Sequence, residues 1–179
     1  MMDVLEKSFY RVGSYGPILL IIPSLLLLRS KEVYFNYYVL ASFLNILLNN
    51  FLKGLIQEPR PSVDKKTFDL ALKHMKSTNY RNAFSHDVFG MPSGHTQSVI
   101  FSTAFVFLVL KHESWMTFFF YVFISIITMV QRIQYKFHTV NQVIAGGFVG
   151  ILFAYLVYYL ASQKSKGILK EKEDENAPM

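Results

Sequence analysis

Residues 143–161 read VIAGGFVGILFAYLVYYLA, an unbroken apolar stretch without a charged side chain. A helix rises about 1.5 Å per residue, so about 20 such residues cross the hydrocarbon core of a bilayer. Four other apolar blocks precede this one, at residues 15–28, 33–52, 98–110 and 115–130. Charges fall between the blocks, and this pattern predicts an all-α integral membrane bundle of about five or six helices.

The composition of the 179-residue chain differs from that of a soluble domain and excludes every site that needs cysteine. Hydrophobic residues make up 52% and charged residues 17%, whereas soluble domains carry about 25% charged residues. The chain has no cysteine, which excludes disulfides, thiolate metal sites and thiol nucleophiles. Its net charge of +6 would suggest nucleic acid in a soluble protein. Here the basic residues lie near the ends of apolar blocks, so we expect membrane lipids or a lipid-linked phosphate as partners, and no nucleic acid.

The chain reads as one membrane-embedded domain, residues 1–163, followed by a polar tail, residues 164–179. We expect the tail to be disordered and exposed. The first apolar block is short for a span, and the preceding residues 1–11 lack the layout of a signal peptide and could form a surface-lying helix. The long connection after residue 53 contains a short amphipathic helix at residues 67–76.

Two helices, expected at residues 98–110 and 115–130, separate the long connection from the polar stretch at residues 131–142. If both helices cross the membrane, the two polar stretches lie on the same face, where they can form one site at the membrane interface. The distribution of Lys and Arg does not select which face this is. Gly146 and Gly150 form a G-x-x-x-G, which permits close helix approach.

The first polar cluster is Lys53-x6-Arg60-Pro61, at the end of the second apolar block. Arg offers a planar fork to phosphate oxygens, and Lys adds a compact charge. Taken alone, the pair also fits a Lys reaching toward the interface and an ordinary loop Arg.

The second cluster, Gly90-Met-Pro92-Ser93-Gly94-His95, directly precedes the third block. It predicts a loop that turns into a helix N-terminus, whose free N–H groups attract anions. Gly94 would allow a phosphate to approach the backbone, and Ser93 could add a hydroxyl donor. An ordinary Ser cap beside a surface His is the alternative.

The third cluster contains Arg132, His138 and Gln142. His138 and Gln142 are spaced i, i+4 and share a helix face. The Gln142 carbonyl could accept a proton from one ring nitrogen of His138 and leave the other nitrogen as a nucleophile. A lone buried His with a satisfied ring is the alternative.

Together, two histidines, two arginines, one lysine and an anion-binding turn provide the groups needed for phosphoryl transfer. No cluster of carboxylates or His residues suggests a metal, so we expect no metal and no cofactor, with the cationic side chains in the metal's role. The other histidines are expected to be surface residues; they are His74, His86 and His112.

These motifs resemble the type 2 phosphatidic-acid phosphatase superfamily, whose pattern is K-x6-R-P, then P-S-G-H, then S-R-x5-H-x3-D. The resemblance covers about residues 52–150. It implies a lipid phosphatase in which His138 attacks phosphorus, His95 serves as acid and base, and Gln142 orients His138. The implied phosphate ligands are Lys53, Arg60, Ser93, Gly94 and Arg132.

Two positions depart from the family pattern. Gln131 replaces the usual Ser, and Gln142 replaces the usual Asp, which removes a charge that would stabilise an imidazolium. Three stretches are similar to the dolichyl-diphosphatase branch, although that branch commonly has Ser where this chain has Gly94. They are Gln57-Glu58-Pro59-Arg60-Pro61, Gly90-Met91-Pro92-Ser93 and Tyr135-x-x-His138-Thr139-x-x-Gln142-Val143.

The resemblance therefore implies hydrolysis of a polyprenyl diphosphate of the dolichyl type through a phosphohistidine. The location would then be the endoplasmic reticulum in a eukaryote, and otherwise the plasma membrane. Phosphatidic acid and undecaprenyl diphosphate are alternative substrates, and a catalytically silent lipid-phosphate binder is an alternative function. A small channel or transporter would leave the phosphate motifs unexplained. The sequence leaves the oligomeric state open.

Overall fold

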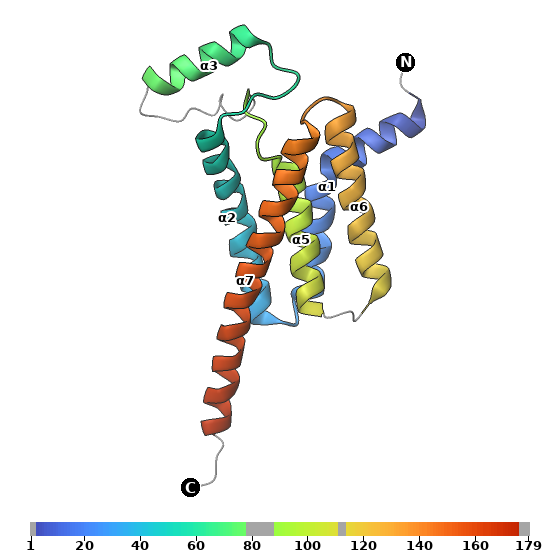
Figure 1. The fold of residues 1–179 in the computed structure, drawn as a ribbon. Coiled ribbons are helices and arrows are strands. Elements are labelled where there is room, and N and C mark those ends of the chain that lie inside the picture. Colours follow the sequence, from blue (N-terminus) through green and yellow to red (C-terminus); the bar gives the residue numbers. More distant parts are fainter. Residues whose placement is uncertain (1–2, 78–87, 111–113, 176–179) are drawn as a thin grey trace.

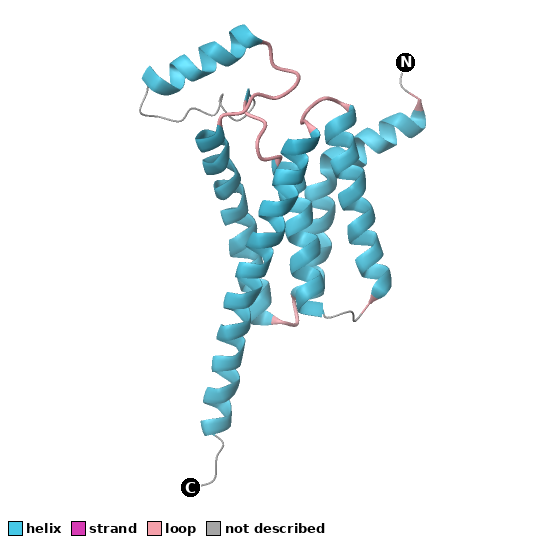
Figure 2. Ribbon diagram, viewed as in Figure 1, coloured by secondary structure: helices cyan, strands magenta, loops and turns pink. Residues whose placement is uncertain are grey.

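The computed structural model describes residues 3–77, 88–110 and 114–175. These residues form six helices (Figure 1), which are α1 (Val4–Leu28), α2 (Glu32–Ile56), α3 (Lys65–Ser77), α5 (Gly94–Leu110), α6 (Trp115–Gln134) and α7 (Val140–Glu175). Most of the remaining chain within the described ranges is loop (Figure 2), with one isolated β-bridge. The predicted all-α class is confirmed.

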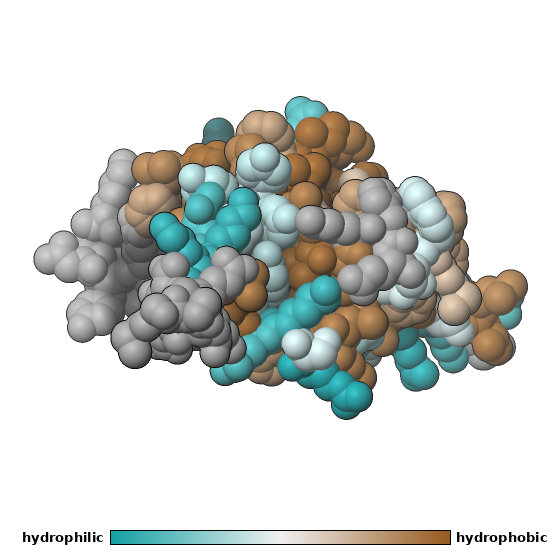
Figure 3. All heavy atoms as spheres, turned by 90° about the horizontal axis from the view of Figure 1, so that it is seen from below, coloured by the Kyte–Doolittle hydropathy of each residue, from teal (hydrophilic) through white to brown (hydrophobic). Residues whose placement is uncertain are grey.

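Four helices, α1, α2, α6 and α7, are long and apolar enough to cross a membrane. At most 33% of the apolar window of each is buried inside the protein, so most of its apolar surface faces outward. An exposed apolar surface of this extent belongs in lipid rather than water. Seen from the end opposite the long connection (Figure 3), apolar residues cover much of the visible surface. The predicted integral membrane protein is therefore confirmed.

A shorter apolar helix, α5, lies at the centre of the bundle and packs against α1, α2, α6 and α7. Its 17 residues span about 25 Å, which is short for a helix exposed to lipid. Buried residues occur all around it, from Thr96 to Leu110, as expected of a helix enclosed by others.

Glycines bring the helices close together at two interfaces. A Cβ added at Gly146 would lie 2.5 Å from the Ser93 carbonyl oxygen, and one at Gly150 would lie 2.6 Å from that of Gln97. The predicted G-x-x-x-G contact therefore joins α7 to the first turns of α5. In α1, Gly13 and Gly16 lie against side chains of α6 in the same way.

A buried amide network joins α2 to α5. Gln97 is fully buried; its Nε2 donates to Oδ1 of Asn45 at 2.8 Å, and its Oε1 accepts from Nδ2 of Asn49 at 2.9 Å. Asn45 also donates to Ser98. Asn45 and Asn49 of the second apolar block thus face another helix, whereas Asn36 is exposed.

Both ends of the chain are more helical than the sequence suggested. The helix α1 begins at Val4, so the short first block is extended backwards, and its first turns project sideways from the bundle (Figure 1). The helix α7 continues to Glu175, although we expected residues after 163 to be disordered. The domain boundary at residue 163 stays a prediction. The amphipathic helix is confirmed as α3, while His86, His112 and the side chain of His74 lie outside the described part.

The glycine contacts give a test of the packing. Gly150→Ala should lower the free energy of unfolding by about 1–3 kcal/mol, because its methyl group would collide with the α5 backbone. Gly147→Ala is the matched control, since its added Cβ would meet only side-chain atoms at 3.9 Å or more. Thermal unfolding in detergent measures both variants. Equal midpoints for the two would contradict the packing.

Candidate active site

The three polar clusters lie at one end of the bundle. The end of α2, the start of α5 and the connection from α6 to α7 lie on the same side (Figure 1). This arrangement confirms that α5 and α6 return the chain to the face from which it left.

Two loops pair with each other above the bundle. The helix α2 ends at Ile56 and is capped by Gln57, whose φ of 53° is left-handed and whose N–H donates to the Lys53 carbonyl. The chain then forms an antiparallel bridge between Pro59 and Phe89. Gly90 N–H donates to the Glu58 carbonyl at 2.7 Å, so the segment that precedes the second cluster is fixed against the segment that carries the first.

His138 is held by the end of α6. The backbone N–H groups of Phe137 and His138 both donate to the Arg132 carbonyl at 3.0 Å. Lys136, with φ of 54°, makes the turn between them possible. The residues between Arg132 and His138 therefore form one tight reverse turn. This turn leaves the His138 side chain only 3% exposed.

Gln142 is fully buried and connects all three clusters. Its Nε2 donates to the Glu58 carboxylate at 2.8 Å and to the Pro59 carbonyl at 2.9 Å. Its Oε1 accepts from Thr139 N–H at 3.2 Å and lies 3.2 Å from Nδ1 of His138. Its backbone carbonyl accepts from Ser93 N–H at 3.0 Å.

These hydrogen-bond partners determine which ring nitrogen of His138 carries the proton. A backbone N–H can only donate and a carbonyl can only accept, so the amide of Gln142 has one consistent orientation, with Oε1 toward His138. Since Oε1 only accepts, Nδ1 of His138 carries the ring proton. The lone pair is then on Nε2, the nitrogen available to attack an electrophile.

Ser93 and Gly94 lie at the N-terminus of α5. The Ser93 hydroxyl oxygen accepts from Thr96 at 3.1 Å, which leaves its own proton for another acceptor. The first N–H groups of α5 have no partner within their own helix. Gly94 also meets a packing demand, because a Cβ there would lie 2.8 Å from Oδ1 of Asn49.

The ring of His95 is held by α1, which the sequence did not indicate. Nε2 of His95 lies 3.2 Å from the Ser14 carbonyl and donates to it. Gln131 donates to the Ser14 hydroxyl at 3.2 Å and accepts from Arg132 at 3.3 Å. Gly13, the neighbour of Ser14, packs on Gln131, but nothing in the sequence pattern singled it out.

Three cations surround the two rings. Lys53 and Arg132 are buried, at 6% and 7% exposed, and together with Arg60 they act electrostatically on both histidines. The Arg132 guanidinium lies 4.2 Å above the Phe137 ring. Its buried Nε has no hydrogen-bond partner among the described residues. A buried donor of this kind, in a cluster of positive charge, suits an anion.

Burial, followed by the positive charges of Arg60 and Lys53, lowers the pKa of His138 to about 3. The free protein therefore holds this imidazole neutral at physiological pH, which is the nucleophilic form. Among the described residues no group of three His, Asp or Glu side chains could hold a metal ion.

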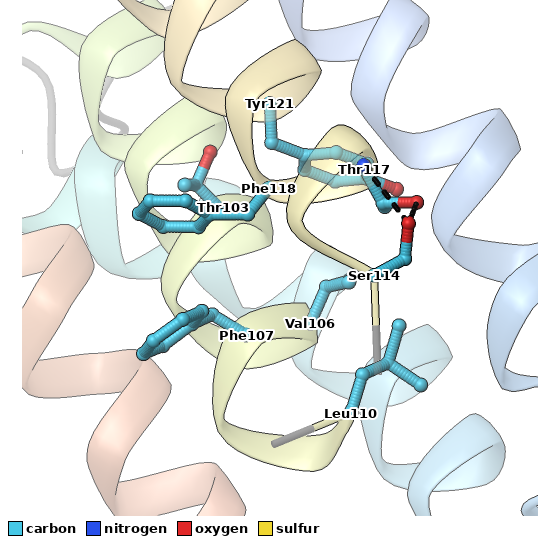
Figure 4. Close-up of a pocket in the computed structure, with 8 residues that line it drawn as sticks. All are labelled: Thr103, Val106, Phe107, Leu110, Ser114, Thr117, Phe118 and Tyr121. Atoms are coloured by element: carbon cyan, nitrogen blue, oxygen red, sulfur yellow. Dashed lines mark hydrogen bonds between the residues drawn. The ribbon is translucent and has the colours of Figure 1, made fainter. Parts of the chain in front are cut away.

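A small pocket between α5 and α6 lies at the opposite end of the bundle (Figure 4). Its polar groups are engaged within the protein. Thr117 donates to Ser114 at 3.1 Å, Thr103 bonds Ser125 at 2.9 Å, and the Tyr121 hydroxyl bonds Ser24 at 2.9 Å. This pocket is a packing feature and holds none of the three clusters.

Comparisons with known proteins agree with this arrangement. The family model of the PAP2 superfamily matches residues 34–166. A solved structure, described as a transmembrane PAP2 type phosphatidylglycerolphosphate phosphatase from Bacillus subtilis, matches with a TM-score of 0.61. The match has 18% sequence identity and covers 91% of this chain and 79% of that one, so it shows the fold alone. No curated protein sequence matches the chain.

The lowered pKa of His138 predicts its titration. From about pH 6.5 down to about pH 3, an unfolded chain binds a proton at this residue that the folded chain does not, so acidification destabilises the fold. In ¹⁵N-histidine NMR spectra of the substrate-free protein, the His138 ring should stay neutral at pH 5. The signal is assigned by its loss in His138→Gln. A titration midpoint near 6.5 would contradict the buried, cation-rich environment.

Proposed function

The chain belongs to the PAP2 superfamily, and we propose that it is a lipid phosphatase that hydrolyses a polyprenyl diphosphate through a phosphohistidine. The observation that supports this most is that His138 and a cluster of buried cations lie together at one end of a membrane bundle, with the ring proton of His138 held on Nδ1.

Phosphate binding falls to the cations and to the start of α5. Lys53, Arg60 and Arg132 neutralise the phosphate oxygens, and the Nε of Arg132 is a donor ready for one of them. The Ser93 hydroxyl and the Gly94 N–H add two further donors at a helix N-terminus. Because the cations are fixed before the substrate arrives, they cost little reorganisation in the transition state.

In the first step, Nε2 of His138 attacks the terminal phosphorus. The negative charge of the bound substrate favours the imidazolium form of His95, with one proton on Nε2 toward Ser14 and a second on Nδ1. The N–P bond forms as the bond to the bridging oxygen breaks, and that oxygen takes the Nδ1 proton of His95. Nδ1 keeps its proton and shares it with Gln142, so the positive charge that develops on the ring is partly stabilised.

In the second step, His95 takes a proton from a water molecule, which attacks the phosphohistidine. The N–P bond breaks, phosphate leaves, and both histidines return to their starting state. His95 is oriented by the Ser14 carbonyl at Nε2, which leaves Nδ1 as the nitrogen for proton transfer. No metal takes part, because the three cationic side chains carry the charge of the transferring phosphoryl group.

The choice of a dolichyl-type substrate rests on the resemblance of the residues around Glu58, Met91 and Gln142 to the dolichyl-diphosphatase branch. Phosphatidic acid and undecaprenyl diphosphate fit the same chemistry. So does phosphatidylglycerol phosphate, the substrate class in the name of the Bacillus subtilis protein. An endoplasmic reticulum location follows only from the dolichyl assignment.

The nucleophile assignment has a direct test. His138→Ala should abolish phosphate release, measured with EDTA present, while the thermal unfolding midpoint stays close to that of the wild type. Asn141→Ala is the control, because Asn141 is exposed in the same turn of α7. Brief incubation with ³²P-labelled substrate should give an acid-labile phosphoprotein in the wild type and none in His138→Ala. Release that survives in His138→Ala would overturn the assignment, and release that EDTA stops would overturn metal independence.

The substrate assignment needs a comparison in one mixed-micelle assay. We expect the highest kcat/KM with dolichyl diphosphate and lower values with undecaprenyl diphosphate, phosphatidic acid and phosphatidylglycerol phosphate. A higher value with any of the other three would replace the dolichyl assignment. Binding of these lipids without any release would instead indicate a silent lipid-phosphate binder.

A further inference from the structure

The proposed reaction steps do not use the carboxylate of Glu58, yet this carboxylate contacts Gln142, the residue that holds the nucleophile. Oε1 of Glu58 accepts from Nε2 of Gln142 at 2.8 Å. Oε1 of Gln142, on the same amide, lies 3.2 Å from Nδ1 of His138. One amide group thus separates a carboxylate from the imidazole.

The backbone of Glu58 is fixed where this contact requires it. Its carbonyl accepts from Gly90 N–H at 2.7 Å, and the next residue, Pro59, forms the bridge to Phe89. Gly90 packs directly on the Gln142 amide and leaves no room there for a Cβ. The geometry around the pair is therefore set by backbone contacts on both sides.

An aspartate at position 142, the usual residue in the family pattern, would not fit these surroundings. It would place a second carboxylate against Glu58 and a second acceptor against the Pro59 carbonyl, with no proton between them. Two like charges held close together in a buried site repel each other. Glutamine satisfies both neighbours and still presents an oxygen to His138.

We propose that Glu58 is a positioning residue that supplies, through the Gln142 amide, the negative charge that a family aspartate supplies to the histidine directly. The carboxylate polarises the amide, so Oε1 becomes a stronger acceptor for the Nδ1 proton. The effect is largest when His138 carries positive charge, in the transition state and in the phosphohistidine. Together with the Pro59 carbonyl and the Thr139 N–H, Glu58 favours the amide orientation that selects the tautomer with its lone pair on Nε2.

A merely structural role for Glu58 would depend on the hydrogen bond and not on the charge. Glu58→Gln separates the two possibilities, because its side-chain oxygen can still accept from Gln142 while the charge is lost. If Glu58 acts only through its hydrogen bond, Glu58→Gln should keep the wild-type activity. If its charge acts on the nucleophile, Glu58→Gln should lower kcat and leave KM unchanged.

The experiment rests on the proposed function and measures lipid diphosphate hydrolysis by the full-length protein in detergent. Glu58→Gln should lower kcat by about 10-fold or more, as the loss of an outer hydrogen-bond partner does at metal-bound histidines, with KM unchanged. Glu58→Asp should retain more activity than Glu58→Gln. Glu32→Gln, which removes an exposed carboxylate at the other end of the bundle, should match the wild type.

The double variant tests the coupling. Gln142→Asp alone should lower kcat, because its carboxylate meets that of Glu58. Combining it with Glu58→Gln should recover part of the loss, since one charge again faces the histidine and residue 58 can donate to it. A double variant no better than the product of the two single effects would overturn the proposal, as would Glu58→Gln with wild-type kcat.

A readout without turnover separates this inference from the proposed function. In ¹⁵N-histidine spectra, the wild-type His138 ring should be the Nδ1–H tautomer, and Glu58→Gln should shift it toward a mixture. If the wild type releases no phosphate but the tautomer shift appears, the function fails and the role of Glu58 stands. If the wild type is active and Glu58→Gln leaves both the tautomer and kcat unchanged, the role of Glu58 fails alone.

Discussion

The side-chain amide of Gln142 lies where three distant segments meet, and it has no access to water. Every hydrogen-bonding group on such a buried amide needs a protein partner, and an unsatisfied one costs about 1–3 kcal/mol. Gln142 finds its partners in the loop after α2, at the start of α7 and in the ring of His138. Its requirement for partners on all sides makes the three motifs into one site, because no segment can move away without leaving a buried group unpaired.

The bundle below the site provides the rigidity that this arrangement needs. The close approach of α7 to α5 at Gly146 and Gly150 sets the height of the Ser93 turn relative to Gln142. On the other side, Asn49 donates to the Pro92 carbonyl and to Gln97, which fixes the same turn from α2. The turn proposed to bind phosphate is therefore held from two helices, by a close backbone approach from α7 and by the buried Asn49 side chain from α2.

Much of this was readable from the sequence, for reasons that are local. Apolar length predicts the spans, the number of helices between two loops predicts a shared face, and the i, i+4 spacing predicts the contact between His138 and Gln142. The interactions that the sequence did not indicate join segments far apart along the chain, such as Ser14 with His95 and Glu58 with Gln142. No periodicity and no motif next to either partner of such a pair predicts the contact between them. The helical continuation of α7 past residue 163 was missed because its composition is polar, whereas Lys and Glu favour helices as well as coils.

The two departures from the family pattern have the same physical basis. Gln131 and Gln142 are both fully buried amides, and each one bridges the motif to a segment outside it. Gln131 donates to Ser14 of α1 and accepts from Arg132; Gln142 donates to the loop after α2 and accepts from the α7 turn. An amide is neutral and offers donors at one end and an acceptor at the other, so it can join a donor and an acceptor across a site without adding a charge to a low-dielectric interior. A serine at position 131 would be too short to reach both partners, and an aspartate at position 142 could not donate to either acceptor beside it. The identity of these two residues therefore follows from the surroundings that α1 and the loop after α2 create, and it is read correctly only together with them.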